Sequence, residues 1–285
     1  MPRVRPLSDF QRDVSQEHER RLSFGSVAEQ YDRHRPSYPA EMVDAVLGYA
    51  GAQPGDRILD VGAGTGRATL LFAARGMRVT AIEPDPGMAA VASKQAATAG
   101  LTLEILDTDF EHATLAEHHF QVLISGTAWH WVTPGLRNRL AARVLSPGGA
   151  LAPFWNRPQW RENPIRPAID AVYRELEEVF AARPSGPMNP CGEPPQIRNA
   201  REWFELEFRG DSNFADVDAR AYRWSQRYTG AEYLALLGTH SDHILLPADA
   251  REQLFRGVSA AIDAAGGSFE LEYETLLCLA RRRST

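Results

Sequence analysis

The segment Ile58-Leu59-Asp60-Val61-Gly62-Ala63-Gly64-Thr65-Gly66 constrains the fold more than any other part of this chain. An apolar run enters three alternate glycines and continues into a helical pattern over 67–75. Glycine adopts positive φ at little cost and has no Cβ to obstruct a ligand. The following helix points its free N–H groups toward the same place. The segment therefore predicts a strand, a tight turn and a helix arranged around a bound ligand.

Strand-like and helix-like runs alternate from about residue 41 to 156. The patterns predict strands at 57–61, 78–82, 101–106, 120–125 and 150–155, with helices at 41–50, 67–75, 86–99 and 136–145. Such alternation forms right-handed βαβ units and a parallel sheet. Ligands bind at the carboxyl ends of the strands in sheets of this kind.

The pattern is looser beyond residue 156. We expect a long helix at 164–182, a strand at 203–209, helices at 231–237 and 248–265, and a final strand at 269–281. Two antiparallel strands would then extend the sheet edge. The helices at about 160–200 and 218–265 would form a lid over the strand ends.

The glycine spacing distinguishes two classes of ligand. A dinucleotide-binding turn has glycine at its first, third and sixth positions, whereas here Gly66 occupies the fifth and Arg67 the sixth. Asp60 precedes the first glycine by two residues, and its charge would repel a pyrophosphate but attract an amino group and a sulfonium. The segment resembles the first motif of class I S-adenosylmethionine-dependent methyltransferases, an apolar strand ending Asp-x-Gly-x-Gly-x-Gly.

The resemblance runs from about residue 24 to 155. Within the family, the chain most resembles the small-molecule branch that includes trans-aconitate methyltransferase-like (methyltransferase type 11) proteins. It implies an α/β fold, with a Rossmann-like, doubly wound, seven-stranded, mostly parallel sheet and a helical lid inserted in the C-terminal half. The predicted domains are an N-terminal arm at 1–40, a cofactor-binding core at 41–157, and lid insertions with the final two strands at 158–285.

The resemblance also implies that S-adenosylmethionine, which leaves as S-adenosylhomocysteine, lies across the first strand ends. At the glycine turn the expected contacts are Asp60, Gly62, Ala63, Gly64 and Gly66. Glu83, next to Pro84 and 21 residues after Gly62, is expected to accept both ribose hydroxyls. The alternative for Glu83 is a helix N-cap or a solvated strand end.

Later strand ends supply further candidates. Asp109 and Phe110 are assigned to the adenine, with Asp107 as the register-shifted alternative; a helix-capping Asp with a core Phe is the structural alternative. Ser125 is small enough to let the methionine part approach. In the N-terminal segment 24–39, Tyr31 would cover the cofactor and Arg35 would pair with its carboxylate, unless this segment simply packs on the sheet edge.

The acceptor site is predicted from aromatic and polar residues at the same edge. His130 is the candidate base, because an unperturbed pKa of about 6.5 suits proton removal near neutral pH. A histidine packed between two tryptophans is the alternative. The candidate acceptor contacts are Tyr38, Trp129, Trp131, Asn156, Arg157 and Tyr222, although the tryptophans equally fit a core. In His240-Ser241-Asp242-His243 a His pair lacks an obvious third ligand, so no metal site is predicted.

Composition narrows the partners. The 31 basic and 37 acidic residues give a net charge of −6, which does not favour a nucleic-acid partner. No run approaches a membrane span, and the first 22 residues lack a signal-peptide apolar region. Two cysteines without a pairing pattern fit a reducing cytoplasm, and Lys94 as the single lysine indicates a bacterial arginine bias.

These observations predict a cytoplasmic, bacterial methyltransferase, monomeric or homodimeric, that acts on a metabolite or natural product of secondary metabolism. Oxygen is the expected acceptor atom, with carbon and nitrogen open. A macromolecular methyltransferase, an NAD-dependent oxidoreductase and a catalytically silent S-adenosylmethionine-binding protein are the alternatives.

Overall fold

A computed structural model describes residues 25–181, 204, 208 and 211–284, which form two compact units. The sheet unit comprises described residues of Pro36–Gln159, Glu193–Gln226 and Leu271–Thr285. The helical unit comprises described residues of Met1–Arg35, Trp160–Gly192 and Arg227–Glu270. The domain boundaries predicted at 40 and 157 remain a prediction beside these units.

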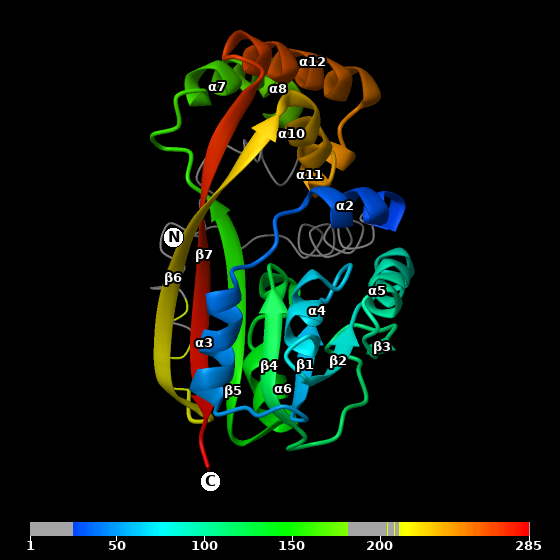
Figure 1. Ribbon diagram of the computed structural model, residues 1–285, viewed down its shortest axis with the longest axis vertical. Helices are drawn as coiled ribbons and strands as arrows, with labels where there is room; N and C mark the ends of the chain where they lie inside the picture. Colours follow the sequence, from blue (N-terminus) through cyan, green and yellow to red (C-terminus); the bar gives the residue numbers. More distant parts are fainter. Residues whose placement is uncertain (1–24, 182–203, 205–207, 209–210, 285) are drawn as a thin grey trace, which may run out of the picture. The chain divides into compact units, whose positions relative to one another are not determined.

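The sheet has seven strands in the order β3-β2-β1-β4-β5-β7-β6 (Figure 1). The parallel strands are β1 (Arg57–Val61), β2 (Arg78–Ile82), β3 (Glu104–Leu106), β4 (Phe120–Gly126) and β5 (Leu145–Pro158). β7 (Ser268–Arg282) pairs antiparallel with β5, and β6 (Phe214–Thr229) is the outer strand beside it. The predicted seven-stranded, mostly parallel sheet is confirmed.

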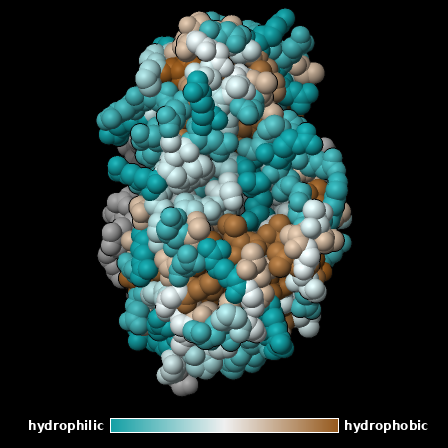
Figure 2. All heavy atoms as spheres, viewed as in Figure 1, coloured by the Kyte–Doolittle hydropathy of each residue, from teal (hydrophilic) through white to brown (hydrophobic). Residues whose placement is uncertain are grey.

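Both faces of the sheet are covered, as a parallel sheet requires. Alternate residues of β1 point to opposite sides, so Leu59 belongs to one buried cluster and Ile58 to the other. The first cluster includes residues of α6 (Arg137–Val144), and the second includes residues of α3 (Ala40–Ala50) and α4 (Arg67–Ala73). Figure 2 shows apolar side chains exposed between polar ones on the visible face of this unit.

Local sequence explains where the helices near the glycine turn begin. α5 (Pro86–Thr98) starts after Asp85, whose side chain accepts the N–H groups of Gly87 and Met88, with proline at the first helical position. α4 follows Gly66 directly. The turn is thus fixed between two well-defined helix starts.

The helical unit contains α2 (Ala28–His34), α7 (Arg166–Glu175), α8 (Glu177–Ala181), α10 (Gly230–Leu237), α11 (Ser241–Ile244) and α12 (Ala248–Ala264), with the short 3-10 turn Gly25–Val27 before α2. α10 starts with a capping box between Thr229 and Glu232. None of the helices among the described residues combines the length and apolar character needed to cross a membrane.

Two sequence predictions about strands are wrong. Phe204 and Phe208, the described residues of the strand predicted at 203–209, are helical, and their rings pack 4.6 Å apart. The other residues of that prediction lie outside the described part of the chain. The second antiparallel strand is instead β6, in a region assigned to the lid. β5 also starts at Leu145, before the predicted residue 150, because Leu145 already pairs with Phe120 of β4 ahead of an irregularity in the register.

The close crossing of α7 and α12 gives a stability prediction. A Cβ on Gly257 would lie 2.5 Å from Cγ1 of Val172, a side chain that is stiff at χ1 in a helix. Gly257→Ala should therefore lower the free energy of unfolding by about 1–2 kcal/mol, since overpacking outweighs the gain in helix propensity. Denaturant unfolding measures the change.

Gly48→Ala in α3 is the matched control. A Cβ there would meet nothing within 4 Å, so this variant should gain roughly 0.5–1 kcal/mol. An equal gain in both variants would contradict the proposed crowding at Gly257.

Candidate functional site

The glycines of the turn after β1 share a backbone conformation but differ in what surrounds them. Gly62, Gly64 and Gly66 have φ values of +72°, +60° and +83°, in the left-handed region that favours glycine. A Cβ on Gly62 would lie 2.5 Å from Cβ of Ala128, so this glycine lets the turn pack on the loop after β4. A Cβ on Gly64 would meet only Met88 Cε, at 3.6 Å. Gly64 is therefore the position with open space beside it, as a ligand cradle requires.

Asp60 lies buried beneath this turn. Its Oδ2 accepts the Thr69 hydroxyl at 2.6 Å, whereas no described residue hydrogen-bonds to its buried Oδ1. Burial raises the pKa of Asp60 to about 7; the bond from Thr69 opposes the shift and the charge of Glu83 adds to it. A buried polar atom without a partner is rare and indicates an absent group. This oxygen suits a cationic or hydrogen-bond-donating ligand.

Glu83, at the end of β2, holds the turn in place. Its Oε2 accepts the Gly64 N–H at 2.7 Å and its Oε1 accepts the Asp85 N–H at 2.9 Å. Burial raises the pKa of Glu83 to about 7 against the effect of these bonds. The N-cap of α5 is Asp85, so the N-cap alternative for Glu83 is wrong. Each Glu83 oxygen retains a second lone pair, and the ribose contacts predicted for Glu83 and Pro84 stay a prediction.

The end of β3 matches the structural alternative only in part, because Phe110 is a core residue but no helix begins at Asp109. Asp109 Oδ1 accepts the His112 N–H at 2.9 Å and lies 2.6 Å from His112 Nδ1. Phe110 is buried against Trp129, with ring centroids 6.2 Å apart. Asp107 is exposed. The adenine contacts of Asp109 and Phe110 remain a prediction, and Asp107 keeps an available carboxylate.

The end of β4 is built closely around Ser125 and Tyr38. The Ser125 hydroxyl is buried and donates to Val61 O at 2.7 Å, which ties β4 to β1. The Tyr38 hydroxyl lies 3.1 Å from Thr127 Oγ1, and its ring meets Phe154 edge-on at 4.7 Å. Thr127 has a φ of +59°, an outlier for a β-branched residue. Backbone strain of this kind gathers at functional sites, and no spacing in the sequence predicted it for Thr127.

His130 is exposed, whereas its two tryptophan neighbours differ. Trp129 is fully buried in the core, and Trp131 is half-buried with its ring 4.8 Å from that of His130. The Trp155 Nε1–H donates to His130 Nδ1 at 3.5 Å. An indole nitrogen only donates, so this contact favours the tautomer with its lone pair on Nδ1 and its proton on Nε2. The base role of His130 stays a prediction, and it requires Nδ1 to leave Trp155.

The other candidate acceptor residues have structural partners. Asn156 Nδ2 donates to Ser37 O at 2.9 Å, and Asn156 Oδ1 accepts the Thr275 hydroxyl at 2.6 Å. Arg157 is half-buried. Tyr222 lies on the outer strand β6 and packs against the cluster that contains α3, and burial raises its pKa. Their contacts with an acceptor are not tested.

Tyr31 and Arg35 belong to the helical unit. The Arg35 guanidinium lies 4.9 Å from the Tyr31 ring centroid and donates to Thr239 Oγ1 and to Thr239 O, each at 2.9 Å. These contacts give Arg35 a partner within its own unit. The predicted contacts of both residues with the cofactor stay a prediction.

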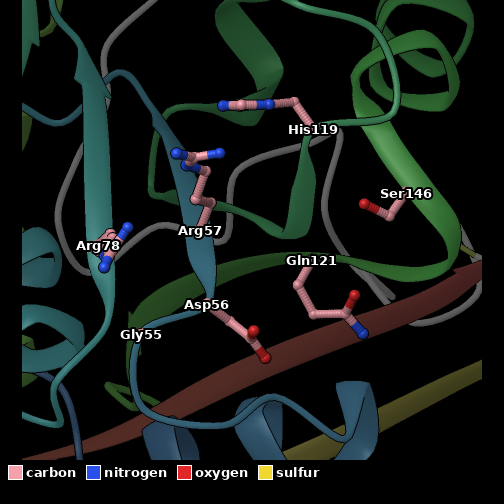
Figure 3. Close-up of a pocket in the computed structure, with 7 residues that line it drawn as sticks. All are labelled: Gly55, Asp56, Arg57, Arg78, His119, Gln121 and Ser146. Carbon is pink, nitrogen blue, oxygen red and sulfur yellow. The ribbon is translucent and has the colours of Figure 1, made fainter.

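A hollow of about 280 Å³ lies at the amino ends of the strands (Figure 3). The glycine turn follows a carboxyl end, so this hollow is not part of the candidate site. Its lining residues are Gly55, Asp56, Arg57, Arg78, His119, Gln121 and Ser146.

Comparison with known proteins identifies the central part of the chain. Residues 59–152 match the family model described as a methyltransferase domain. An uncharacterized methyltransferase of Mycobacterium tuberculosis (strain H37Rv) is 37% identical over 158 residues, which cover 55% of this chain and 62% of that protein. The malonyl-[acyl-carrier protein] O-methyltransferase of Serratia marcescens is 31% identical over 134 residues, or 44% and 51% of the two chains. The chain thus matches less than two thirds of these relatives' length.

Solved structures agree with the fold. A protein of Anaeromyxobacter dehalogenans assigned as a type II methyltransferase has a TM-score of 0.59 at 21% identity, covering 88% of this chain and 99% of its own. A second structure is that of phosphoethanolamine N-methyltransferase 2 of Haemonchus contortus with phosphomonomethylethanolamine and S-adenosylhomocysteine. It has a TM-score of 0.53 at 12% identity, and the match covers 91% of this chain and 57% of that one. At these identities the likeness supports the fold.

The raised pKa of Asp60 predicts a pH-dependent stability difference. The folded protein holds this proton up to about pH 7, whereas the unfolded chain releases it near 3.8. The stabilisation is therefore complete below 3.8 and is lost as the pH rises through 7. Asp60→Asn avoids that loss, so at pH 8 the variant should be more stable than the wild type by roughly 1–3 kcal/mol.

Unfolding midpoints measured from pH 5 to pH 8 test this expectation. Asp263→Asn, at an exposed position on α12, changes the net charge equally and should leave the pH profile unchanged. If the stability profiles of the wild type and of Asp60→Asn stay parallel over this range, Asp60 does not titrate near pH 7 in the folded protein.

Proposed function

We propose that this chain, which carries the methyltransferase domain of the class I S-adenosylmethionine-dependent family, transfers a methyl group from S-adenosylmethionine to a small-molecule acceptor. The main support is the buried carboxylate of Asp60 under the glycine turn, with one oxygen that no described residue hydrogen-bonds. An amino group, bound directly or through water, and a nearby sulfonium offset such a charge. The family match over residues 59–152 gives independent support.

The residues at the first two strand ends fit this cofactor. The turn from Asp60 to Gly66 would hold its methionine part, with Gly64 as the point of close approach. Glu83 would accept the ribose hydroxyls while it keeps the Gly64 N–H in place. The sulfonium methyl is itself the electrophile, so the protein's task is to align the acceptor for in-line displacement and to exclude water.

The acceptor is proposed to be a small molecule that reacts at oxygen. A net charge of −6 does not favour a polyanion. A relative that shares 31% identity over 134 residues is named as an O-methyltransferase. A carboxylate acceptor needs no base, which agrees with a His130 lone pair already engaged by Trp155. Methylation of carbon or nitrogen is the alternative; like methylation of a hydroxyl oxygen, it would require that lone pair to be released.

The setting of the reaction is part of the same proposal. We place the enzyme in a bacterial cytoplasm and in secondary metabolism, as a monomer or homodimer. The support is compositional: Lys94 is the only lysine, and the described cysteine, Cys278, is a buried free thiol.

Calorimetric titration with S-adenosylhomocysteine, with NAD as the parallel ligand, tests the cofactor. We expect roughly micromolar affinity for the former alone. Glu83→Ala should weaken it by about tenfold or more, because the ribose loses its acceptors and Gly64 loses its partner. Glu104→Ala, at an exposed position on β3, is the matched control. Binding of NAD only, or equal affinity in wild type and Glu83→Ala, would refute the assignment.

His130→Ala separates the two kinds of acceptor. With a carboxylate acceptor the kcat should change less than about twofold, whereas a hydroxyl, amine or carbon acceptor should lose about a hundredfold. The measurement is turnover of labelled methyl donor once an acceptor is known. Trp155→Phe is the companion variant: it removes the indole donor to Nδ1 and so leaves the lone pair of His130 without this contact. A large loss with a carboxylate acceptor would contradict the base-free reaction.

A further inference from the structure

The helical unit contains a group of ligating side chains that the proposed function does not use. His240, Asp242 and His243 each offer one nitrogen or oxygen, and these atoms all lie within 4.8 Å of one another. Asp242 and His243 belong to α11, and His240 is its N-cap. The sequence alone predicts no metal site here, because a His pair lacks an obvious third ligand. The structure brings the Asp242 carboxylate to the same point as the two imidazoles.

The spacing approaches that of a tetrahedral site. Ligand atoms about 2.0–2.2 Å from one tetrahedral ion lie roughly 3.3–3.5 Å from each other. Asp242 Oδ1 and His243 Nδ1 are 3.1 Å apart, so this pair needs little adjustment. The His240 and His243 rings are 5.5 Å apart at an angle of 67°, and among the described residues the His240 ring accepts and donates no hydrogen bond. A small rotation of His240 would complete a three-ligand set.

The surroundings of His243 resemble the outer sphere of a metal site. The Tyr173 hydroxyl, on α7, lies 2.6 Å from His243 Nε2. With an ion on Nδ1, the ring proton would occupy Nε2 and be donated to the Tyr173 oxygen. Metal-bound histidines usually donate their second nitrogen in this way, which fixes the ring orientation. Tyr173 would then be a positioning residue rather than a ligand.

The local charge is nearly balanced before any ion binds. The Arg35 guanidinium acts electrostatically on His240, and it is anchored by its two hydrogen bonds to Thr239. Its charge opposes a second cation, whereas the buried Asp242 carboxylate attracts one. Two imidazoles and one carboxylate suit zinc better than calcium or magnesium, which prefer oxygen ligands. His240 is only partly buried, so an ion could enter from its side.

We infer that His240, Asp242 and His243 form a zinc site in the helical unit, with a fourth position open to water or to an exogenous ligand. The site is separate from the glycine turn and does not depend on the proposed methyl transfer. A bound ion would link α11 through His243 to Tyr173 on α7.

The test uses full-length protein from which any histidine tag and all metal have been removed. Zinc chloride is added, excess is dialysed away, and zinc per chain is measured by mass spectrometry. Cobalt chloride in parallel reports ligand geometry by visible absorption. We expect one zinc per chain, a cobalt spectrum of tetrahedral type, and a higher thermal midpoint with zinc.

His240→Ala, Asp242→Asn and His243→Gln should each lower zinc affinity at least about tenfold. His119→Ala removes a histidine of the sheet unit and should bind like the wild type. Because His240 is partly exposed, its variant tests the site even where the buried variants fail to fold. Tyr173→Phe should still bind zinc, more weakly.

Two results would overturn the inference. One is a wild type without stoichiometric zinc, which would leave Asp242, His243 and Tyr173 as a metal-free hydrogen-bonded chain. The other is equal zinc binding by wild type and His240→Ala. Calorimetry with S-adenosylhomocysteine, run on the same samples, shows separately whether the proposed cofactor site is intact.

Discussion

The hydrogen bond from the Gly64 N–H to Glu83 Oε2 joins the turn after β1 to the end of β2, and the candidate site depends on it. The bond holds a left-handed glycine whose neighbouring space is open, directly above the buried Asp60. The same carboxylate also accepts the Asp85 N–H, where α5 begins. The Glu83 side chain therefore connects the glycine turn, the end of β2 and the start of α5. Burying two carboxylates here is costly, and burial accordingly raises the pKa of each to about 7.

The parts of the fold that could be predicted from sequence are those whose cause is local. The glycine turn, β1, β2, α5 and α12 follow from positive-φ positions, apolar runs and helical spacing within a few residues. β6 could not be predicted in this way, because its polar and aromatic residues fit a strand only where β7 lies beside it. Phe204 and Phe208 show the converse, since two phenylalanines four apart satisfy both a loose alternation and a helix face.

In the candidate site, the sequence predicted which side chains lie at the carboxyl ends of the strands but not which residues they contact. Ser125 and Asn156 lie near the carboxyl ends of β4 and β5, and their polar atoms bond to Val61, Ser37 and Thr275 within the fold. Phe110 likewise packs on Trp129. These contacts join residues far apart in the chain, so no spacing reveals them. Thr127 was missed for a related reason: its positive φ goes with contacts to distant residues, since its N–H donates to Phe154 O at 2.7 Å and its Oγ1 lies 3.1 Å from the Tyr38 hydroxyl.

The contact between Trp155 and His130 shows how such packing bears on chemistry. From the sequence alone, a histidine after a strand end predicts a base, because the ordinary pKa of histidine is near neutral. Once an indole N–H occupies Nδ1, the neutral ring presents a donor at Nε2 rather than a lone pair. A donor at that edge suits an acceptor that already carries a negative oxygen, which it can orient without removing a proton. The state of the His130 ring thus depends on a tryptophan 25 residues away in the chain, and the residues next to His130 in the sequence do not reveal this contact.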